Sequence, residues 1–418
     1  MPGADGYFGV CVLIARLKIS TENKLFQYLQ KLKAQNWGMV IFLVMITIVV
    51  STPIYYRRIV IPVDTDYGSH IRFAGEWLRG EGFEPLTASH PLLQYILIGI
   101  RLASRGRVGL YSALIILQIG VQVATVMILY FWFGKADRTG WDLLRGFAAF
   151  SLTFVAPIML LVPLDGLYYF GYIGLANYHN PTVHLLKPLA LLSAMHAFRA
   201  IGGFKSSVWQ MFFAALWIIL SACIKPSYAL SILPALALAA CIRWIFRENV
   251  DVKMLLFGFF LPALVVLAVQ WLIAYRFGDP GENIILAPLQ MESSFSDYLL
   301  PKFLLSGAFP LTILFMARRS LLKDAHLLVG WTGFLSGITQ LYLLAEGGER
   351  LLHGNFRWSA QIMLFLLFAV SMRWLLREGI LNGVMTTWQK MAAYGVYLAH
   401  LGGGIAYYIY CMISVRYG

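Results

Sequence analysis

The run GMVIFLVMITIVVSTPIYY, residues 38–56, carries no charged side chain. An α-helix rises 1.5 Å per residue, so this run is long enough to cross the hydrocarbon core of a bilayer. It is the first of many such runs in a chain whose residues are 59% hydrophobic and 13% charged, with a mean hydropathy of +0.70. This composition predicts a polytopic membrane protein whose helices form one bundle.

Eleven apolar runs have the length of transmembrane helices. They lie at about 38–56, 109–133, 146–164, 182–198, 208–224, 227–246, 254–275, 303–317, 327–345, 358–375 and 391–414. Residues 91–103 are also apolar, but this segment is short and ends among Arg101, Arg105 and Arg107, so we predict that it does not cross. We therefore expect an all-α polytopic membrane protein with about eleven transmembrane helices, within a range of 10–13, and further helices at the membrane interface.

The distribution of charge predicts the orientation. A net charge of +13 suggests nucleic acid in a soluble chain, but the cytoplasmic loops of membrane proteins collect Lys and Arg, so we expect no nucleic-acid partner. If 91–103 stays outside the membrane, the cytoplasmic segments hold 19 of the 33 basic residues. Residues 1–37 are then a cytoplasmic N-terminal segment, and 38–418 form a single transmembrane domain without internal repeats. The predicted external loops are 57–108, 165–181, 276–302 and 346–357.

The loop 57–108 concentrates titratable side chains. Its segment PVDTDYGSHIRFAGEWLRGEGFEPLTASHPLL, residues 62–93, begins with the carboxylates Asp64 and Asp66. On a helix Asp66 and His70 share one face, while an apolar stripe on another face favours a position in the membrane interface. Such a carboxylate pair either deprotonates an acceptor hydroxyl or, with His70, binds a divalent cation, and either Asp is also suited to cap the following helix. We interpret 57–108 as a catalytic loop.

A second constellation is ANYHNPTVHLLKP, residues 176–188. Asn180 followed by a proline is typical of a helix start. His184 lies in the first turn, where backbone N–H groups attract anions, and Lys187 lies about 10 Å beyond the cap at 1.5 Å per residue. A lysine at that depth is a functional candidate unless it snorkels to the interface. We predict that His184 and Lys187 hold a phosphate together, and we include His179 among the substrate ligands.

Two further segments place cations at the external ends of helices. In SACIKPSYALS, residues 221–231, Lys225 precedes a proline in a tight turn between two runs. In EGGERLLHGNFRW, residues 346–358, the arginines are suited to bidentate contacts with phosphate or carboxylate. An ordinary interfacial anchor is an equally good reading of both segments. The candidate substrate- or phosphate-binding residues are His70, His90, His179, His184, Lys187, Lys225, Arg350, His353 and Arg357.

External cations beside external acids fit a substrate that joins a phosphate to a reacting hydroxyl. The pattern resembles the GT-C superfamily of integral-membrane glycosyltransferases, which use polyprenyl-phosphate sugars. The matching pieces are DTDY at 64–67, HPLLQYILIGI at 90–100 and IKPSY at 224–228. In that superfamily an acidic residue of the first external loop is the usual base, which corresponds here to Asp64 or Asp66. The acids are separated by one residue and the helix opens with His-Pro rather than a double proline, so the choice between them stays open.

The resemblance implies an enzyme that moves a sugar from a polyprenyl-phosphate donor to a hydroxyl of a glycolipid or glycan acceptor. Asp64 or Asp66 would be the general base, and the one cofactor considered is a divalent cation at Asp64, Asp66 and His70. With the predicted orientation, the protein belongs in a bacterial inner membrane, with a cytoplasmic N-terminus and a periplasmic active site.

Two other functions stay open on the sequence. An O-antigen-type polysaccharide polymerase or ligase has a similar size, but it places Arg and His in a large late external loop, whereas 346–357 is short. A lipid or solute transporter carries ionisable residues near the centres of its spans and an internal repeat. Here the charges gather at the ends of the predicted spans, which favours the enzyme.

Overall fold

The computed structural model describes residues 36–61, 65–82, 88–276 and 283–415. The chain divides into a short unit, residues 1–42, of which the structure describes only the start of one helix, and a main unit from Leu43 to Gly418. The described elements are, in chain order, α2 (Trp37–Val60), α3 (Tyr67–Leu78), α5 (Leu92–Ala103), α6 (Leu110–Trp132), α7 (Trp141–Leu152), α8 (Val162–Asp165), α9 (Pro181–Ile201), α10 (Val208–Ile224), α11 (Ser227–Ile245), η1 (Met254–Phe260), α12 (Leu261–Trp271), η2 (Leu272–Arg276), β1 (Ile284–Leu286), α13 (Gln290–Ser293), α14 (Leu299–Ala317), α15 (Ala325–Leu343), β2 (Leu344–Glu346), η3 (Gly348–Arg350), α16 (Arg357–Trp374), η4 (Leu375–Leu381) and α17 (Thr387–Ile413).

Seven helices in the described part of the chain are long and apolar enough to cross a membrane, so the chain is an integral membrane protein. They are α2, α6, α11, α12 with its π-helical ends η1 and η2, α14, α16 with η4, and α17. Three more predicted runs form α9, α10 and α15. Of these, α10 has only 17 residues, and α9 and α15 are long enough but less apolar.

The predicted span at 146–164 is wrong. Helix α7 ends at Leu152, and the chain continues through irregular backbone that lies buried in the main unit. Pro157 has no backbone N–H and cannot continue a helix. His400 of α17 satisfies this backbone instead, because its carbonyl accepts from the N–H of Ala156 at 3.2 Å and its Nδ1 lies 2.8 Å from the Ala156 carbonyl. Irregular backbone inside a membrane bundle requires such internal partners.

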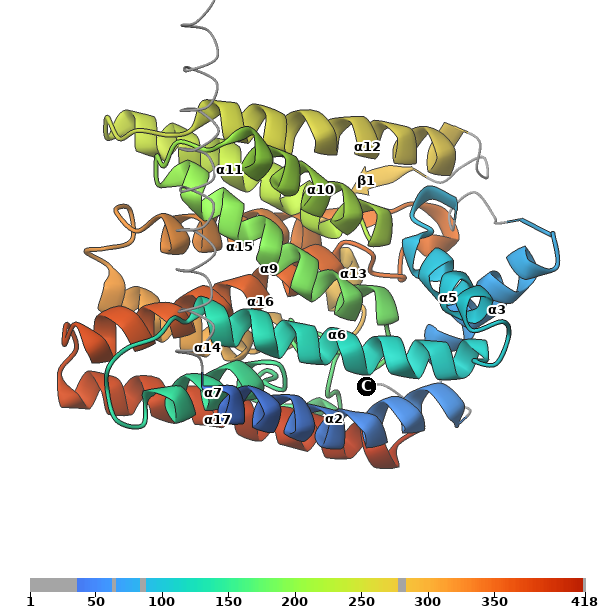
Figure 1. Cartoon of the computed structure of the whole chain (residues 1–418), viewed down its shortest axis with the longest axis horizontal. Helices are drawn as coiled ribbons and strands as arrows, with labels where there is room; N and C mark the ends of the chain where they lie inside the picture. Colours follow the sequence, from blue (N-terminus) through green and yellow to red (C-terminus); the bar gives the residue numbers. More distant parts are fainter. Residues whose placement is uncertain (1–35, 62–64, 83–87, 277–282, 416–418) are drawn as a thin grey trace, which may run out of the picture. The chain divides into compact units, whose positions relative to one another are not determined.

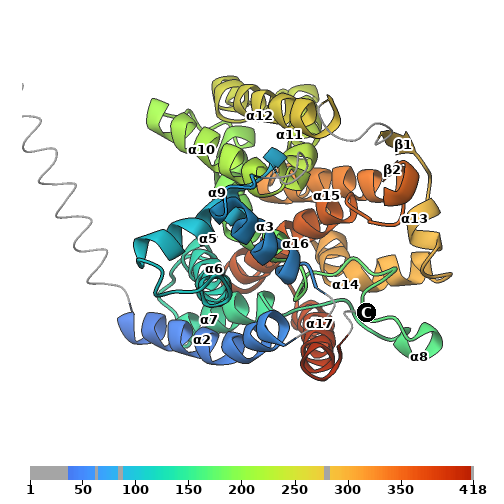
Figure 2. The same cartoon turned by 90° about the vertical axis from the view of Figure 1, so that its right-hand side faces the viewer.

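Helix α16 forms the core of the main unit. It is the most buried of the seven apolar helices, with 94% of its most apolar window inside the protein. Figure 2, an end-on view, shows α9, α11, α14, α15 and α17 around it. Gly337 of α15 allows a close approach, since a Cβ at that position would lie 2.8 Å from the carbonyl oxygen of Ser359. A helix that is apolar all round is expected at such a central position.

The segments predicted as external gather at one end of the main unit. Helices α3 and α5 and strand β1 lie at the right-hand end in Figure 1, and Figure 2 looks onto that end. Helix α3 buries Tyr67, Ile71 and Ala74, which confirms the predicted apolar stripe. Helix α5 has twelve residues, about 18 Å, which is too short for a hydrocarbon core of about 30 Å.

Two short strands depart from the all-α expectation. Strand β1 pairs antiparallel with β2, with Ile284 opposite Glu346 and Leu286 opposite Leu344. The pairing joins the predicted external loops 276–302 and 346–357, which are far apart in the sequence. It therefore fixes the chain just before Arg350 and supports the end of the bundle at which the candidate site lies.

Candidate functional site

A cavity of about 500 Å³ lies beside the turn between α10 and α11. Its wall is mostly apolar and comes largely from α12, with Leu264, Leu267 and Trp271 on that side. Its polar lining residues are Ser89, His90, Lys225, Ser227, Gln270, Glu346, Arg350, Asn355 and Ser359. An apolar cavity of this size with a few convergent polar groups is the usual form of a ligand site.

The local sequence explains the position of Lys225. Helix α10 ends at Ile224 and α11 begins at Ser227, which confirms the predicted turn. Lys225 adopts the extended backbone that a following proline requires, with φ −163° and ψ 125°. Its Nζ lies 3.5 Å from the Thr182 hydroxyl and 4.8 Å from the centre of the Trp358 ring. Burial lowers the pKa of Lys225 to about 8, although the charges of Asp66 and Glu346 oppose the shift. The side chain is therefore a cation at neutral pH.

Hydrogen bonds connect Lys225 to Asp66 through the start of α9. Asn180 Nδ2 donates to Asp66 Oδ2 at 2.5 Å, and the Thr182 hydroxyl donates to Asn180 Oδ1 at 2.6 Å. The same Oδ1 accepts from the backbone N–H groups of Thr182 and Val183 at 3.1 Å, so Asn180 is the predicted N-cap of α9. We call this connection, Lys225–Thr182–Asn180–Asp66, the α9 relay. It joins a cation and a carboxylate without placing them in a direct ion pair.

The backbone also holds Asp66 in place. Its N–H donates to the carbonyl oxygen of His179 at 2.9 Å, and its own carbonyl accepts from the N–H of His70 at 3.1 Å. Asp66 thus begins α3 as predicted, but its side chain forms no capping bond to that helix and reaches Asn180 instead. The contact brings together segments 114 positions apart in the sequence.

Three histidines surround these charges, and none of them is charged at neutral pH. His70 Nδ1 lies 2.9 Å from Gln94 Nε2, and His90 Nδ1 lies 2.7 Å from Ser89 Oγ. Burial, aided by the positive charge of Lys225, lowers the pKa of His70 and of His90 to about 3. Burial and nearby basic groups do the same to His179. These rings therefore offer hydrogen bonds to a ligand but no charge.

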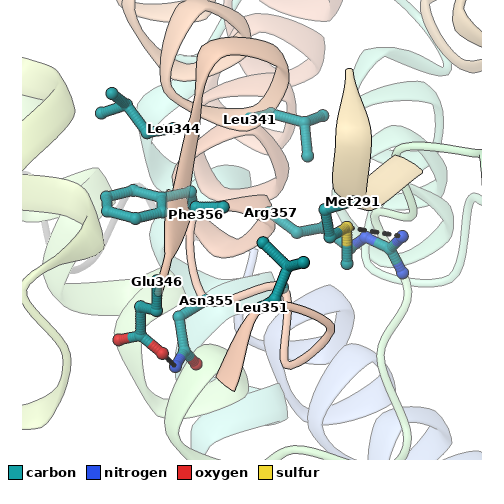
Figure 3. A pocket seen from close by; sticks show the side chains of 10 residues that line it. Met291, Leu341, Leu344, Glu346, Leu351, Asn355, Phe356 and Arg357 are labelled. Carbon is teal, nitrogen blue, oxygen red and sulfur yellow. Dashed lines mark hydrogen bonds between the residues drawn. The ribbon is translucent and has the colours of Figure 1, made fainter. Parts of the chain in front are cut away.

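The loop after β2 supplies the second charged group at the cavity. Arg350 Nε lies 3.5 Å from Glu346 Oε2, and Asn355 Nδ2 donates to the same oxygen at 2.7 Å. Figure 3 shows Glu346 and Asn355 side by side, while Arg357 points away from them toward Met291. Arg350 is thus paired with Glu346, and Lys225 is the second cation that lines the cavity.

The structure does not place two predicted ligands of this loop at the cavity. Arg357 is buried, and its guanidinium donates to both carboxylate oxygens of Glu292 at 2.8–3.0 Å, between the rings of Tyr169 and Phe170. His353 is exposed and does not line the cavity. Arg357 is committed to an internal ion pair that the sequence pattern did not reveal.

His184 and Lys187, which we predicted to hold a phosphate together, each contact another part of the protein. The two ring nitrogens of His184 lie 2.8 Å from Gln118 Oε1 and 2.5 Å from Gln122 Oε1, both on α6. Lys187 Nζ donates to the carbonyl oxygen of Leu175 at 2.8 Å. Both side chains are therefore used in packing α9 against its neighbours, and neither snorkels to the surface.

Asp64 lies outside the described residues. Asp66 and His70 both lie near the cavity, but no cluster of three or more His, Cys, Asp or Glu side chains occurs in the ranges that the structure describes. The predicted divalent-cation set of Asp64, Asp66 and His70 thus stays a prediction.

Sequence reasoning missed three partners. Asn180 was expected as a cap, but not as the hydrogen-bond donor to Asp66, and Thr182 and Trp358 were not expected beside Lys225. A signal for Asn180 exists, since an asparagine that caps a helix with its oxygen still has an amide nitrogen to donate. The contacts of Lys225 are non-local and leave no such signal.

Comparison with known proteins gives no match: no family model, no curated protein and no solved structure is similar to this chain. The function therefore has to be inferred from the chemistry of the site itself.

Proposed function

We propose that the protein is a membrane glycosyltransferase that moves a sugar from a polyprenyl-phosphate donor to a hydroxyl of a glycolipid or glycan acceptor. The observation that carries the proposal is a cavity with a mostly apolar lining that also contains Lys225. The α9 relay then connects Lys225 to the carboxylate of Asp66. Such a transfer needs an apolar surface for the polyprenyl chain, a cation for the phosphate and a base for the acceptor hydroxyl.

In this proposal the donor lies along the cavity. The first part of the polyprenyl chain contacts the α12 wall, and the remainder extends into the bilayer. Lys225 binds the phosphate, and His90 and Arg350 contact it from the rim, since both line the same cavity. A charge-assisted hydrogen bond from Lys225 is the strongest of these contacts.

The transfer itself needs a base on the acceptor and a stabilised leaving group. Asp66 takes the proton of the acceptor hydroxyl, whose oxygen attacks the anomeric carbon of the sugar. The bond between that carbon and the phosphate oxygen breaks, and the electron pair leaves with the polyprenyl phosphate. Lys225 stabilises the charge that develops on this oxygen. Asn180 orients Asp66 through its short hydrogen bond.

We place the site on the periplasmic face of a bacterial inner membrane, with the N-terminus in the cytoplasm. Arg318, Arg319 and Lys323 follow α14 at the end away from the site, as the excess of basic residues in cytoplasmic loops leads one to expect. A polyprenyl-phosphate sugar carries its own leaving group, so the transfer requires no nucleotide on that face.

The test is an assay of the purified chain in lipid with a panel of radiolabelled polyprenyl-phosphate sugars and glycolipid acceptors. We expect Asp66→Asn to lower the transfer rate by roughly 10²–10⁴-fold, the usual contribution of a positioned base. Asp137→Asn, an exposed change of the same kind, should leave the rate unchanged, and Asp64→Asn decides between the two acids. Equal transfer by wild type and Asp66→Asn would refute the mechanism. No transfer from any donor, with polyprenyl phosphate still bound, would favour a polymerase or a transporter.

A further inference from the structure

Three arginines at the end of α5 have no acidic partner in the described part of the chain. Arg101 lies in the last turn of the helix, and Arg105 and Arg107 follow in the turn that leads to α6. The arginines of the neighbouring α3 differ, because Arg72 lies 3.7 Å from a carboxylate oxygen of Glu76, and Arg79 lies 2.6 Å from one of Glu81. Among the described residues, the end of α5 is therefore a concentration of positive charge without an ion-pair partner.

The turn that carries these arginines has a fixed conformation. Gly106 N–H donates to the carbonyl of Arg101 at 2.8 Å, and Arg107 N–H donates to that of Ser104 at 3.1 Å. The Ser104 hydroxyl also accepts from the N–H of Val108 at 3.1 Å. Arg105 adopts a left-handed backbone with φ +53°, which is unfavourable for a residue with a Cβ. The backbone of the three arginines is thus held in one short turn, with Arg105 and Arg107 exposed.

Apolar side chains lie next to this charge. Tyr95 and Leu102 of α5 are 47% and 61% exposed, although the opposite face of the helix buries Leu93 and Leu97. Trp77 of α3 contacts Tyr95 edge to face, with ring centres 6.2 Å apart. Exposed Trp and Tyr beside basic side chains are typical of a helix that lies at the boundary between lipid headgroups and acyl chains.

We propose that α5 and the turn after it bind anionic phospholipid headgroups of the bilayer. Arg101, Arg105 and Arg107 contact the headgroup phosphates, and Tyr95 and Leu102 enter the adjoining acyl layer. The carbonyl end of α5 attracts a cation in its last turn, which accounts for Arg101, but it does not account for the two arginines beyond the helix. A negatively charged lipid surface complements all three.

This surface has a consequence for the candidate site, although it does not depend on the proposed reaction. Gln94 of α5 hydrogen-bonds to His70 of α3 at 2.9 Å, and His90 stands two residues before α5. Lipid bound along the outer face of α5 therefore steadies the segment that carries His90 of the cavity and Gln94, the partner of His70. The protein would bind anionic phospholipid even if it were not a transferase.

The test is lipid titration of the full purified chain, with bound lipids counted by mass spectrometry of the intact complex. Wild type should retain phosphatidylglycerol in preference to phosphatidylcholine with the same acyl chains. Each arginine near an anionic surface contributes about fivefold, so replacing Arg101, Arg105 and Arg107 with Gln should weaken phosphatidylglycerol binding by about a hundredfold. The matched control replaces Arg72 and Arg79, which are already paired, and should change binding by less than about twofold.

Two results would overturn the proposal. One is a triple variant that binds phosphatidylglycerol as tightly as wild type, and the other is an Arg72 and Arg79 control variant that loses as much affinity as the triple variant. Arg105→Gln and Arg107→Gln as single exposed changes extend the test if the triple variant does not fold. Each should weaken binding by about fivefold, and an effect that persists unchanged at high salt would also contradict an electrostatic surface.

Discussion

Asn180 offers the sharpest test of the site, because its side chain has two roles that different substitutions separate. Its Oδ1 caps α9 through two backbone N–H groups, and its Nδ2 donates to Asp66 at 2.5 Å. Asn180→Ala removes both roles. Asn180→Ser keeps a good N-cap, since serine and asparagine are about equally favourable there, but it removes the donor to Asp66.

The structure sets the expected magnitudes. Loss of an N-cap costs about 1 kcal/mol, and loss of a hydrogen bond to a charged group costs about 1.5–3 kcal/mol. Asn180→Ala should therefore lower the free energy of unfolding by about 2.5–4 kcal/mol. Asn180→Ser should lower it by about 1 kcal/mol less. Both variants should lose sugar transfer to a similar extent, because in both Asp66 is no longer oriented.

Unfolding in mixed detergent micelles measures the first quantity, and the radiolabel assay measures the second. Asn180→Ser with wild-type transfer would show that the bond to Asp66 is dispensable, and the assignment of Asp66 would fall with it. If Asn180→Ser were as unstable as Asn180→Ala, the cap would not explain the stability of α9. Asp137→Asn again serves as the unaffected control.

Three further predictions concern charge and packing. Burial lowers the pKa of Lys225 to about 8, so Lys225 loses its proton as the pH rises from 7 to 9, and the affinity for polyprenyl phosphate should fall. The Lys225→Arg variant stays charged over this range and should keep its affinity. A wild-type affinity that does not change between pH 7 and 9 would contradict the assignment. Arg357→Met should lower the free energy of unfolding by about 3–5 kcal/mol, because it leaves Glu292 buried without its partner. Adding Glu292→Leu should restore most of this stability, as measured by unfolding in micelles. Purely additive effects of the two substitutions would disprove the pairing. Gly403→Ala should destabilise the protein by about 1–3 kcal/mol, because the added Cβ would overlap a backbone carbonyl of the irregular segment after α7. Gly402→Ala is the control, since a Cβ at that position meets open space. Equal melting temperatures of the two variants would show that the contact at Gly403 is absent.

Local chemistry explains which parts of the fold the sequence predicted. Long apolar runs identify membrane helices, and Lys225 followed by proline identifies the turn between α10 and α11. Asn180 followed by proline identifies the start of α9. Each of these signals depends on residues within a few positions of one another, so it survives without knowledge of the tertiary structure.

The failures all depend on distant partners. The break after α7 is stable only because His400 supplies hydrogen bonds to the irregular backbone. His184 resembles an anion ligand until Gln118 and Gln122 of another helix are placed against its ring. Arg357 resembles a surface cation until Glu292 is found beside it. In each case the residue type was right for a site, and a partner outside the local segment determined its use.

The α9 relay shows how the proposed site can keep a cation and a carboxylate close together. A direct ion pair between Lys225 and Asp66 would lower the basicity of the carboxylate and neutralise the cation. Neither group would then be available to a substrate. In the structure Asn180 hydrogen-bonds to Asp66, Thr182 hydrogen-bonds to Lys225, and the two side chains hydrogen-bond to each other. They are held there because the first turn of α9 has backbone N–H groups that need a capping oxygen. The start of one helix thus contacts both charged groups, and this is why the proposed site centres on Asn180, a residue that was expected only to begin that helix.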